Sequence, residues 1–489
     1  MKLTQIPELL HCEPVPAPDL EIAAVTEDSR RVAPGAVFVA VPGARTDGHA
    51  YVRQAVEAGA IAVVGARPEA GQVHGVPYFG VENPRRAVGL LAHAVAGWPS
   101  LDMKVAGITG TNGKSSTVAL VQRALEVGGH RAAAFGTLGY DIAGARTAAR
   151  HTTPFAEDLA AMFKQAREAH QTHVVMEVSS HALDQDRVAG IDFDVAAFTN
   201  LTQDHLDYHG DMDAYRRAKL RLFERIEGAG RFTVVNRDDA SADAFIAASH
   251  VDCFTFGNRG DCRATEIRIE VSGTRFHAAT PWGDTDIAMR LLGEHNVSNA
   301  LCALAICGGL GVPINRIAQG IGSLESVPGR FEYVDAGQDF LVVVDYAHTE
   351  DGLRNVLLAA RALRPKRIIL VFGCGGDRDR TKRPKMAAVA AELADYAVIT
   401  SDNPRSEDPA RIILDIESGI QHAGKKKGDD YLVFADRAEA IRRAIGMAEP
   451  GDLVLIAGKG HEDYQIIGTE RIHFDDREVA RRMLKETDD

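Results

Sequence analysis

The feature that most constrains this chain is a glycine-rich run at residues 107–117, which contains Gly-Ile-Thr-Gly-Thr-Asn-Gly-Lys-Ser-Ser-Thr. It follows a strand-like segment at 104–109 and leads into a helical pattern at 117–127. Small residues let successive backbone N–H groups approach a polyphosphate at a helix N-terminus, where the helix dipole also favours anions. Lys114 is expected to reach the terminal phosphates, and the hydroxyl of Ser115 to bind Mg²⁺. The run predicts a nucleotide-binding loop in an α/β fold.

The glycine spacing departs from the usual nucleotide-binding loop. That loop has a glycine five residues before Gly113, and this chain has Ile108 there. The alternative interpretation is a strand-to-helix turn that binds nothing. The strand–turn–helix context and the Gly-Lys-Ser-Ser-Thr run favour the nucleotide loop.

Length and the alternation of segments predict three domains. The chain has 489 residues, and domains average about 150 residues. A first region with short β-branched runs ends near residue 100, and a second closes near residue 328. In the second and third regions strand-like and helical segments alternate, as in mostly parallel sheets covered by helices. We therefore expect a small mixed α/β domain at 1–100, a central parallel-sheet domain of the P-loop type at 101–328 and a Rossmann-like domain at 329–489.

Composition excludes several classes of protein. With 55 Lys and Arg against 68 Asp and Glu, the net charge is −13, which disfavours nucleic acid or an anionic membrane as partner. No signal peptide or apolar stretch of about 18 residues is visible, so we expect a cytoplasmic protein without a membrane anchor. The six cysteines form no CxxC pair, so neither structural zinc nor a disulfide framework is expected.

Two clusters of polar residues follow the glycine-rich run. Glu177 ends a buried strand-like segment, and a carboxylate there is well placed for a metal. His205 belongs to a second run rich in histidine and aspartate; a structural hydrogen bond and a catalytic role are both open for it. Lys219 lies in a helical pattern, where a solvated lysine is the ordinary expectation.

Three loops of the third region also carry charge after predicted strands. They span 372–385, 401–405 and 458–462. Ligands bind at the carboxyl ends of parallel strands, so these loops indicate a second ligand pocket. Arginines there suit a carboxylate, and Asp402 or Glu462 suits an ammonium group. Solvated loops with scattered charge are the alternative.

Together these motifs resemble those of the Mur ligases, ATP-dependent enzymes that add amino acids in peptidoglycan synthesis. The resemblance covers essentially the whole chain and accounts for the glycine spacing. The motifs, in the family's order, begin at Gly110, Glu177, Thr199, Asp204, Gly293, Pro328 and Asp345.

Within the family the chain resembles the members that add meso-diaminopimelate, and the discriminating element is the Asp402–Arg405 segment. Diaminopimelate differs from lysine by one distal carboxylate, for which Arg405 would be a bidentate partner. Lysine would leave that arginine unpaired. The resemblance thus implies addition of this amino acid to UDP-N-acetylmuramoyl-L-alanyl-D-glutamate, through an acyl phosphate, in building the cell wall needed for shape and division. Alternatives are a lysine-adding ligase on the same scaffold, a folate polyglutamate ligase, which fits poorly, and a non-enzymatic nucleotide-dependent switch.

The resemblance also implies site residues. Those implied for catalysis are Lys114, Glu177, His205 and Lys219. Those implied for ATP are Gly110, Thr111, Asn112, Gly113, Lys114, Ser115, Ser116, Asn296, Arg330 and Asp345. Those implied for the UDP-muramyl dipeptide are Glu27, Ser29, Ala44, Arg45, Thr46, His151, Thr152, Thr153, Ser179, Gln185 and Arg187. Those implied for diaminopimelate are Arg378, Asp402, Asn403, Pro404, Arg405, Gly458 and Glu462.

For the metal, the resemblance implies Ser115, Glu177, His205 and a carbamylated Lys219 as Mg²⁺ ligands, with His205 and Asp345 alternatively only orienting. Two positions depart from the family's pattern. His151 replaces a usual asparagine, and Glu350 replaces a common proline. Small-molecule substrates and a monomer are expected.

Overall fold

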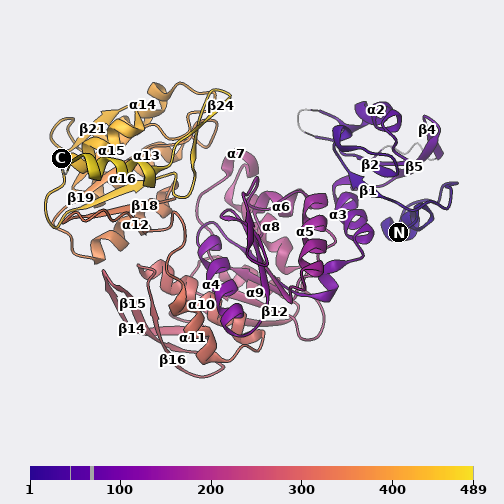
Figure 1. The fold of residues 1–489 in the computed structure, drawn as a ribbon, viewed down its shortest axis with the longest axis horizontal. Coiled ribbons are helices and arrows are strands. Elements are labelled where there is room, and N and C mark those ends of the chain that lie inside the picture. The colour runs from indigo at the N-terminus through magenta and orange to yellow at the C-terminus, as the bar shows by residue number, and fades with distance from the viewer. Residues whose placement is uncertain (44–45, 67–70, 488–489) are drawn as a thin grey trace.

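The computed structural model describes residues 1–43, 46–66 and 71–487. The chain forms an N-terminal part at one end, a central part, and a C-terminal part at the other end (Figure 1). Each of the three parts contains a sheet made mainly of parallel strands, which confirms the predicted α/β class. The exact boundaries near residues 100 and 328 stay a prediction.

The N-terminal sheet has five strands, of which only the last pairs antiparallel. In spatial order the strands are β1 (Ala24–Thr26), β2 (Ala36–Ala40), β3 (Ala62–Gly65), β5 (Val76–Gly80) and β4 (Gly71–Val73). The helices of this part are α1 (Ile6–Leu10), α2 (Val52–Glu57) and α3 (Pro84–Val95). Helix α3 packs against the central domain so closely that a side chain at Gly89 would collide with the backbone of Ala189. The two parts are therefore in tight contact.

The central sheet has eight strands, six parallel and two antiparallel at one edge. In spatial order they are β13 (Asp252–Phe256), β12 (Phe232–Asn236), β11 (Val195–Phe198), β6 (Lys104–Thr109), β10 (His173–Glu177), β7 (Ala132–Gly136), β8 (Gly139–Ile142) and β9 (Ala145–Thr147). Side chains of β6 alternate between two cores, with Ile108 on one face and Val105 on the other, as expected for a strand covered on both faces.

Helices cover both faces of this sheet. One face carries α4 (Lys114–Val127), α10 (Glu294–Gly309) and α11 (Ile314–Ser323). The other carries α5 (Ala156–Glu168), α8 (Met212–Phe223) and α9 (Ala242–Ala247). Two short helices, α6 (Ser180–Asp184) and α7 (Leu206–His209), lie in loops that follow strands. Helix α8 begins where the Asp211 side chain accepts a hydrogen bond from the N–H of Ala214.

An antiparallel three-stranded sheet was not predicted. It consists of β14 (Arg263–Glu270), β15 (Gly273–Ala279) and β16 (Thr285–Met289), and β16 packs on α11. Most side chains of β14 are exposed, so the sequence lacks the buried β-branched runs that mark the other strands.

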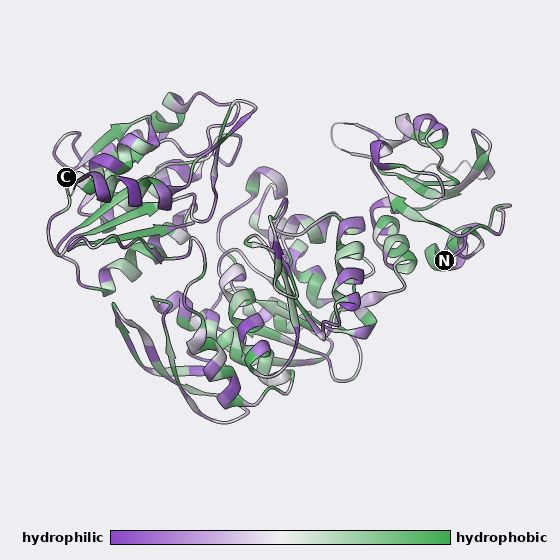
Figure 2. Ribbon diagram, in the orientation of Figure 1, coloured by the Kyte–Doolittle hydropathy of each residue, from purple (hydrophilic) through white to green (hydrophobic). Residues whose placement is uncertain are grey.

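The C-terminal sheet has six strands, of which only the first pairs antiparallel. In spatial order they are β17 (Glu332–Tyr333), β18 (Leu341–Asp345), β22 (Leu453–Ala457), β19 (Ile368–Phe372), β20 (Tyr396–Thr400) and β21 (Tyr431–Phe434). On one face lie α12 (Glu350–Ala362), α13 (Lys382–Leu393) and α14 (Pro409–His422); on the other, α15 (Arg437–Gly446) and α16 (Asp476–Thr487). Figure 2 shows the central strands of this sheet as hydrophobic. A separate hairpin joins β23 (Tyr464–Ile467) and β24 (Glu470–His473).

Candidate active site

The glycine-rich run forms the turn between β6 and α4, as predicted. Its glycines have φ angles that other residues rarely adopt, +151° at Gly110 and +86° at Gly113. A side chain at Gly110 would collide with Thr199, and one at Gly113 with Asn299. Ile108 is fully buried inside β6. The loop therefore begins only at Gly110, and position 108, where the usual nucleotide-binding loop has a glycine, belongs to the strand.

Two lysines converge on one carbonyl oxygen of this loop. Lys114 Nζ donates to the Gly110 carbonyl at 2.8 Å, and Lys219 Nζ, from α8, donates to the same oxygen at 2.9 Å. Lys219 is 1% exposed and its ammonium lies 4.4 Å from the centre of the Tyr215 ring. Burial, and then the charge of Lys114, lower the pKa of Lys219 well below its ordinary value. Both effects disfavour the protonated form of Lys219.

Glu177 ends β10 directly beside the glycine-rich loop. Its carboxylate accepts hydrogen bonds from Ser115 Oγ at 2.8 Å and from the N–H of Thr137 at 2.8 Å. Arg330 reaches in from the C-terminal domain, and its Nη2 donates to Ser115 Oγ at 3.2 Å. A hydroxyl and a carboxylate in contact are oxygen donors of the kind that Mg²⁺ prefers. In the described ranges no three His, Cys, Asp or Glu side chains form a metal-binding group.

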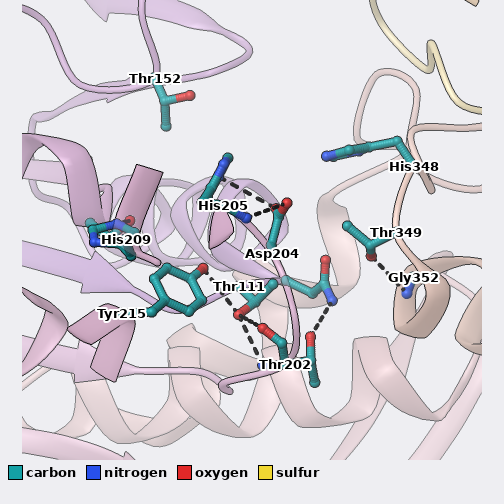
Figure 3. A network of polar contacts seen from close by, with 12 residues as sticks. Thr111, Thr152, Thr202, Asp204, His205, His209, Tyr215, His348, Thr349 and Gly352 are labelled. Carbon is teal, nitrogen blue, oxygen red and sulfur yellow. Dashed lines mark hydrogen bonds and ion pairs between the residues drawn. The ribbon is translucent and has the colours of Figure 1, made fainter. Parts of the chain in front are cut away.

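His205 lies in a polar network over the same loop (Figure 3). Its Nε2 is 3.4 Å from Asp204 Oδ2, and its ring is 4.8 Å from that of His181. Burial lowers the pKa of His205, so the neutral ring is favoured. Burial opposes ionisation of Asp204, but the positive charges around it and the hydrogen bond from the His205 N–H lower the pKa of that carboxyl overall. Tyr215, whose hydroxyl is 3.2 Å from Thr111 Oγ1, connects this network to the loop.

A pocket opens between the central and C-terminal domains at the glycine-rich loop. Of the residues predicted for ATP, six line it: Asn112, Gly113, Ser115, Ser116, Arg330 and Asp345. The remaining lining residues, which sequence reasoning did not single out, include Asn200, His295, Asn299, Tyr346, His348 and Asn355. Some of these residues could have been predicted from the sequence. The motifs that carry the family resemblance include His295, Asn299, Tyr346 and His348.

Two of the predicted nucleotide residues are themselves held by neighbours. Asp345 accepts 2.7 Å hydrogen bonds from the N–H groups of Phe331 and Ala347, while burial raises its pKa. Asn296 does not line the pocket; its Oδ1 accepts a hydrogen bond from Asn299, which faces Gly113. Its position suits support of the loop rather than direct contact with a nucleotide.

A second pocket lies in the N-terminal domain. It contains three of the predicted residues, Glu27, Ser29 and Thr46. Ala44 and Arg45 lie outside the described residues. The lining residues that were not predicted include Asp28, Arg30, Tyr51, Gln54 and Arg85.

A smaller pocket connects this N-terminal site to the central domain. Glu27 and Arg85 line it together with the predicted residues Gln185 and Arg187. Arg187 donates to Gln185 Oε1 at 2.7 Å and to the Thr153 carbonyl at 3.0 Å. The two pockets share residues, so one elongated ligand can contact both domains.

The other predicted dipeptide residues lie between Arg187 and Glu177. Thr153 Oγ1 donates to the Glu177 carbonyl at 2.9 Å, and Ser179 N–H donates to Thr153 Oγ1 at 3.0 Å. Thr152 Oγ1 accepts a 3.1 Å hydrogen bond from Thr137. His151 is exposed, with its ring edge-on to Phe155.

The charged loops of the C-terminal domain meet, as predicted, at the ends of β19, β20 and β22. Asn403 Nδ2 donates to Glu462 Oε2 at 2.8 Å, and Lys459 Nζ lies 3.2 Å from that oxygen and 3.6 Å from Asp402 Oδ1. Lys459, which is fully buried, was not singled out from the sequence. Gly458 has φ +121° and approaches Asp402 so closely that a Cβ would lie 3.0 Å from its carboxylate.

Arg405 stands at the edge of this cluster. Its Nη1 donates to the carbonyl of Gly376 at 2.8 Å, and within the described chain it forms no ion pair with a carboxylate. Pro404 approaches Gly376 closely, and Arg378 is exposed with Nη1 donating to the Asp377 carbonyl at 3.0 Å. The guanidinium of Arg405 thus retains donors for an anionic ligand.

Sequence comparison finds three matching family descriptions along the chain. They are the Mur ligase family catalytic domain over residues 21–95, the Mur ligase middle domain over 108–307, and the Mur ligase glutamate ligase domain over 329–460. Two relatives are named UDP-N-acetylmuramoyl-L-alanyl-D-glutamate–2,6-diaminopimelate ligase. The one from Syntrophomonas wolfei is 44% identical over 99% of both chains, and the one from Geobacillus thermodenitrificans is 46% identical over 95% of both.

Solved structures agree in fold. A structure of a UDP-N-acetylmuramoyl-L-alanyl-D-glutamate–2,6-diaminopimelate ligase has a TM-score of 0.71 at 31% identity and covers all of both chains. The MurF ligase of Thermotoga maritima in complex with ADP has a TM-score of 0.63 at 18% identity, covering 95% of this chain and 96% of that one.

None of the helices in the described ranges has the length and apolar character that a membrane crossing requires.

Proposed function

The chain belongs to the Mur ligase family, and we propose that it joins meso-diaminopimelate to UDP-N-acetylmuramoyl-L-alanyl-D-glutamate at the expense of ATP. The relatives that carry this name match it over almost their whole length. It is an ATP-dependent ligase of peptidoglycan precursor synthesis that forms ADP. The observation that carries the proposal is the meeting of Ser115, Glu177 and Arg330 beside the glycine-rich loop.

The reaction requires activation of the D-glutamyl side-chain carboxylate. One carboxylate oxygen attacks the γ-phosphorus of ATP, the bond from that phosphorus to the bridging oxygen breaks, and an acyl phosphate and ADP result. The amine of diaminopimelate then attacks the acyl carbon, phosphate leaves, and the amine loses a proton. Positioning and charge neutralisation dominate in such chemistry.

Arg330 lines the central pocket, and Lys114 belongs to the glycine-rich loop beside it. Lys114 bonds to two carbonyls of its own loop, Gly110 and Thr111, at 2.8 Å each, and can turn toward phosphates that bind there. Arg330 lies 4.6 Å from the Tyr346 ring centre, which fixes its guanidinium above the pocket. Gly110, Thr111, Asn112, Gly113 and Ser116 would contribute backbone and hydroxyl donors to the nucleotide.

Ser115 and Glu177 would hold Mg²⁺, with His205 as a further ligand or an orienting group. When bound, Mg²⁺ supplies neutralisation of the phosphate charge. The contact of Ser115 with Glu177 fits such an ion. We also propose that Lys219 is carbamylated, because its amine is buried beside the glycine-rich loop and has a lowered pKa, so that it can add CO₂ and become an anion suited to a second Mg²⁺.

The two ends of the molecule would bind the other substrates. Glu27, Ser29 and Thr46 would contact the uridine diphosphate end, and Gln185 and Arg187 the muramyl peptide. Thr152, Thr153, Ser179 and His151 would lie along the peptide toward Glu177. Arg405 would pair with the distal carboxylate of diaminopimelate, and Glu462 with its ammonium group. The rest of that site would be formed by Asp402, Asn403, Pro404, Gly458 and Arg378. We also propose that the protein is a cytoplasmic monomer.

The deciding experiment measures ADP release with and without the muramyl dipeptide and with diaminopimelate or lysine as acceptor. We expect sustained ADP release, over many turnovers, only when dipeptide and diaminopimelate are both present. Equal turnover of lysine would overturn the specificity, and ADP release independent of the dipeptide would favour a nucleotide-dependent switch.

A further inference from the structure

The β23–β24 hairpin pairs with the loop that carries Arg405. Both strands lie outside the main C-terminal sheet, and the hairpin turns at Gly468, where φ is +61°. Arg405 pairs with Ile467 in the parallel sense, so an isolated β-bridge joins the loop to β23. We propose that this hairpin, through Gln465 and Gly468, sets the selectivity for the amino acid that is added. This inference rests on the proposed function.

Four hydrogen bonds attach the hairpin to the 402–405 loop, three from β23 and one from the turn at Gly468. Gln465 Nε2 donates to the Asp402 carbonyl at 2.6 Å, and the N–H of Ile466 donates to Asn403 Oδ1 at 2.9 Å. The N–H of Arg405 donates to the Ile466 carbonyl at 3.1 Å, and the N–H of Gly468 donates to the Arg405 carbonyl at 2.8 Å. Three residues of the loop are therefore each tied to the hairpin.

Arg405 needs this support because of its backbone conformation. Its φ is +51°, in the left-handed region that residues with a side chain rarely occupy. Such a conformation persists only where the surroundings determine it. Arg405 donates one hydrogen bond to the hairpin through its N–H and accepts another through its carbonyl, so its backbone is held before and after the strained φ angle. The hairpin consequently fixes the direction in which the guanidinium leaves the chain.

Gln465 is a positioning residue rather than a catalytic one. It is 7% exposed, and its amide is bonded to the Asp402 backbone. A bidentate arginine–carboxylate pair depends on the orientation of both planes. Displacement of the loop should therefore weaken recognition of the distal carboxylate and leave the nucleotide pocket unchanged.

The test compares wild type with Gln465→Met, which keeps the side-chain length and removes the donor. Steady-state kinetics would be measured with meso-diaminopimelate and with lysine. We expect KM for diaminopimelate to rise about tenfold, and the ratio of kcat/KM for diaminopimelate over lysine to fall about as much. KM for ATP and for the muramyl dipeptide should stay within about twofold.

Gly468→Ala is the second variant. No atom lies within 4 Å of an added Cβ, so only the left-handed φ opposes it. We expect the same loss of selectivity in weaker form, and this variant decides the matter if Gln465→Met does not fold. Gln421→Met is the matched control, because Gln421 bonds to the Tyr431 hydroxyl instead of the loop; its selectivity should equal that of wild type.

The outcomes separate the two proposals. If wild type does not prefer diaminopimelate, the proposed function fails. If wild type prefers it and the folded variants keep the full preference, only the role of the hairpin is overturned. A fall in kcat with both amino acids at unchanged KM would also overturn it.

Discussion

Asn112 of the glycine-rich loop donates a 2.8 Å hydrogen bond to Asp351 at the start of α12. The same carboxylate lies 3.5 Å from Thr202 Oγ1 and accepts from Asn355 Nδ2 at 3.1 Å. Asp351 therefore links the nucleotide loop of the central domain to the C-terminal domain. Closure of such domains around substrates commonly assembles a catalytic site.

Asp351→Ala should weaken this link. We expect kcat to fall about tenfold and KM for ATP to rise several-fold, because three hydrogen bonds to one carboxylate are lost. Kinetics together with small-angle scattering in the presence of ATP would measure the effect. Glu350→Ala, at the neighbouring position of α12, is the control. Equal effects of the two substitutions would contradict a specific role for Asp351.

Lys219→Ala should abolish most activity if Lys219 is carbamylated. We expect a loss of about a hundredfold or more, since an anion beside the phosphates would be missing. Short carboxylic acids such as acetate or formate should restore part of the activity by occupying the vacated space. The measurement is the rate as a function of acid concentration.

Lys219→Arg is the matched control, because it keeps a cation that cannot carry a carbamate. We expect it to be inactive and not to respond to added acid. Wild-type activity in either variant would remove the carbamate from the mechanism.

Several strands of the main sheets could be predicted from the sequence because they are buried. β6 coincides with the strand predicted at 104–109, and β19, β20 and β22 end where strands were predicted before the three charged loops, since continuous apolar runs are typical of parallel sheets. The β14–β16 sheet could not be predicted, because the side chains of β14 are mostly exposed. The spacing of apolar residues along a strand reflects which of its side chains are buried. One face of this sheet is not covered by another element of the described chain, so its strands lack a continuous apolar run.

The candidate site was predictable where motifs carry it and not where tertiary contacts do. Ser115, Glu177 and Arg330 were predicted separately, and the fold brings them together. Lys459 and Gln465 act through buried contacts with residues about 60 positions away. No local pattern indicates such partners, because a lysine or glutamine after a strand is ordinarily solvated.

Arg405→Ala should remove the preference for diaminopimelate. We expect kcat/KM for diaminopimelate to fall about a hundredfold or more and kcat/KM for lysine to change far less. Arg405→Lys should recover little, because an ammonium cannot form the bidentate pair. Competition between the two amino acids, followed by mass spectrometry of the product, would measure the ratio.

The exposed Arg411 of α14 provides the control for charge alone. Arg411→Ala should keep the wild-type ratio. An unchanged ratio in Arg405→Ala would assign recognition of the distal carboxylate to another residue.

Glu157 makes the contact between the N-terminal and central domains sensitive to pH. Its side chain is 7% exposed, Oε1 is 3.4 Å from Arg31 Nη1, and within the described chain Oε2 has no hydrogen-bond partner. Burial raises the pKa of Glu157 from 4.5 to about 7. The folded state then binds the proton more tightly than the unfolded state does. The stability that the protonated carboxyl contributes is present below pH 4.5 and is lost as the pH rises through about 7.

Glu157→Gln should therefore raise the melting temperature at pH 8 and have little effect at pH 5. At pH 8 we expect a gain of about 1–3 kcal/mol in the free energy of unfolding, since the cost of a buried anion disappears. Thermal denaturation across pH 5–8 measures it. Glu168→Gln, at the exposed end of the same helix, should show a much smaller difference because its carboxylate is solvated. If Glu157→Gln destabilises the protein equally at both pH values, the contact with Arg31 outweighs the cost of burial.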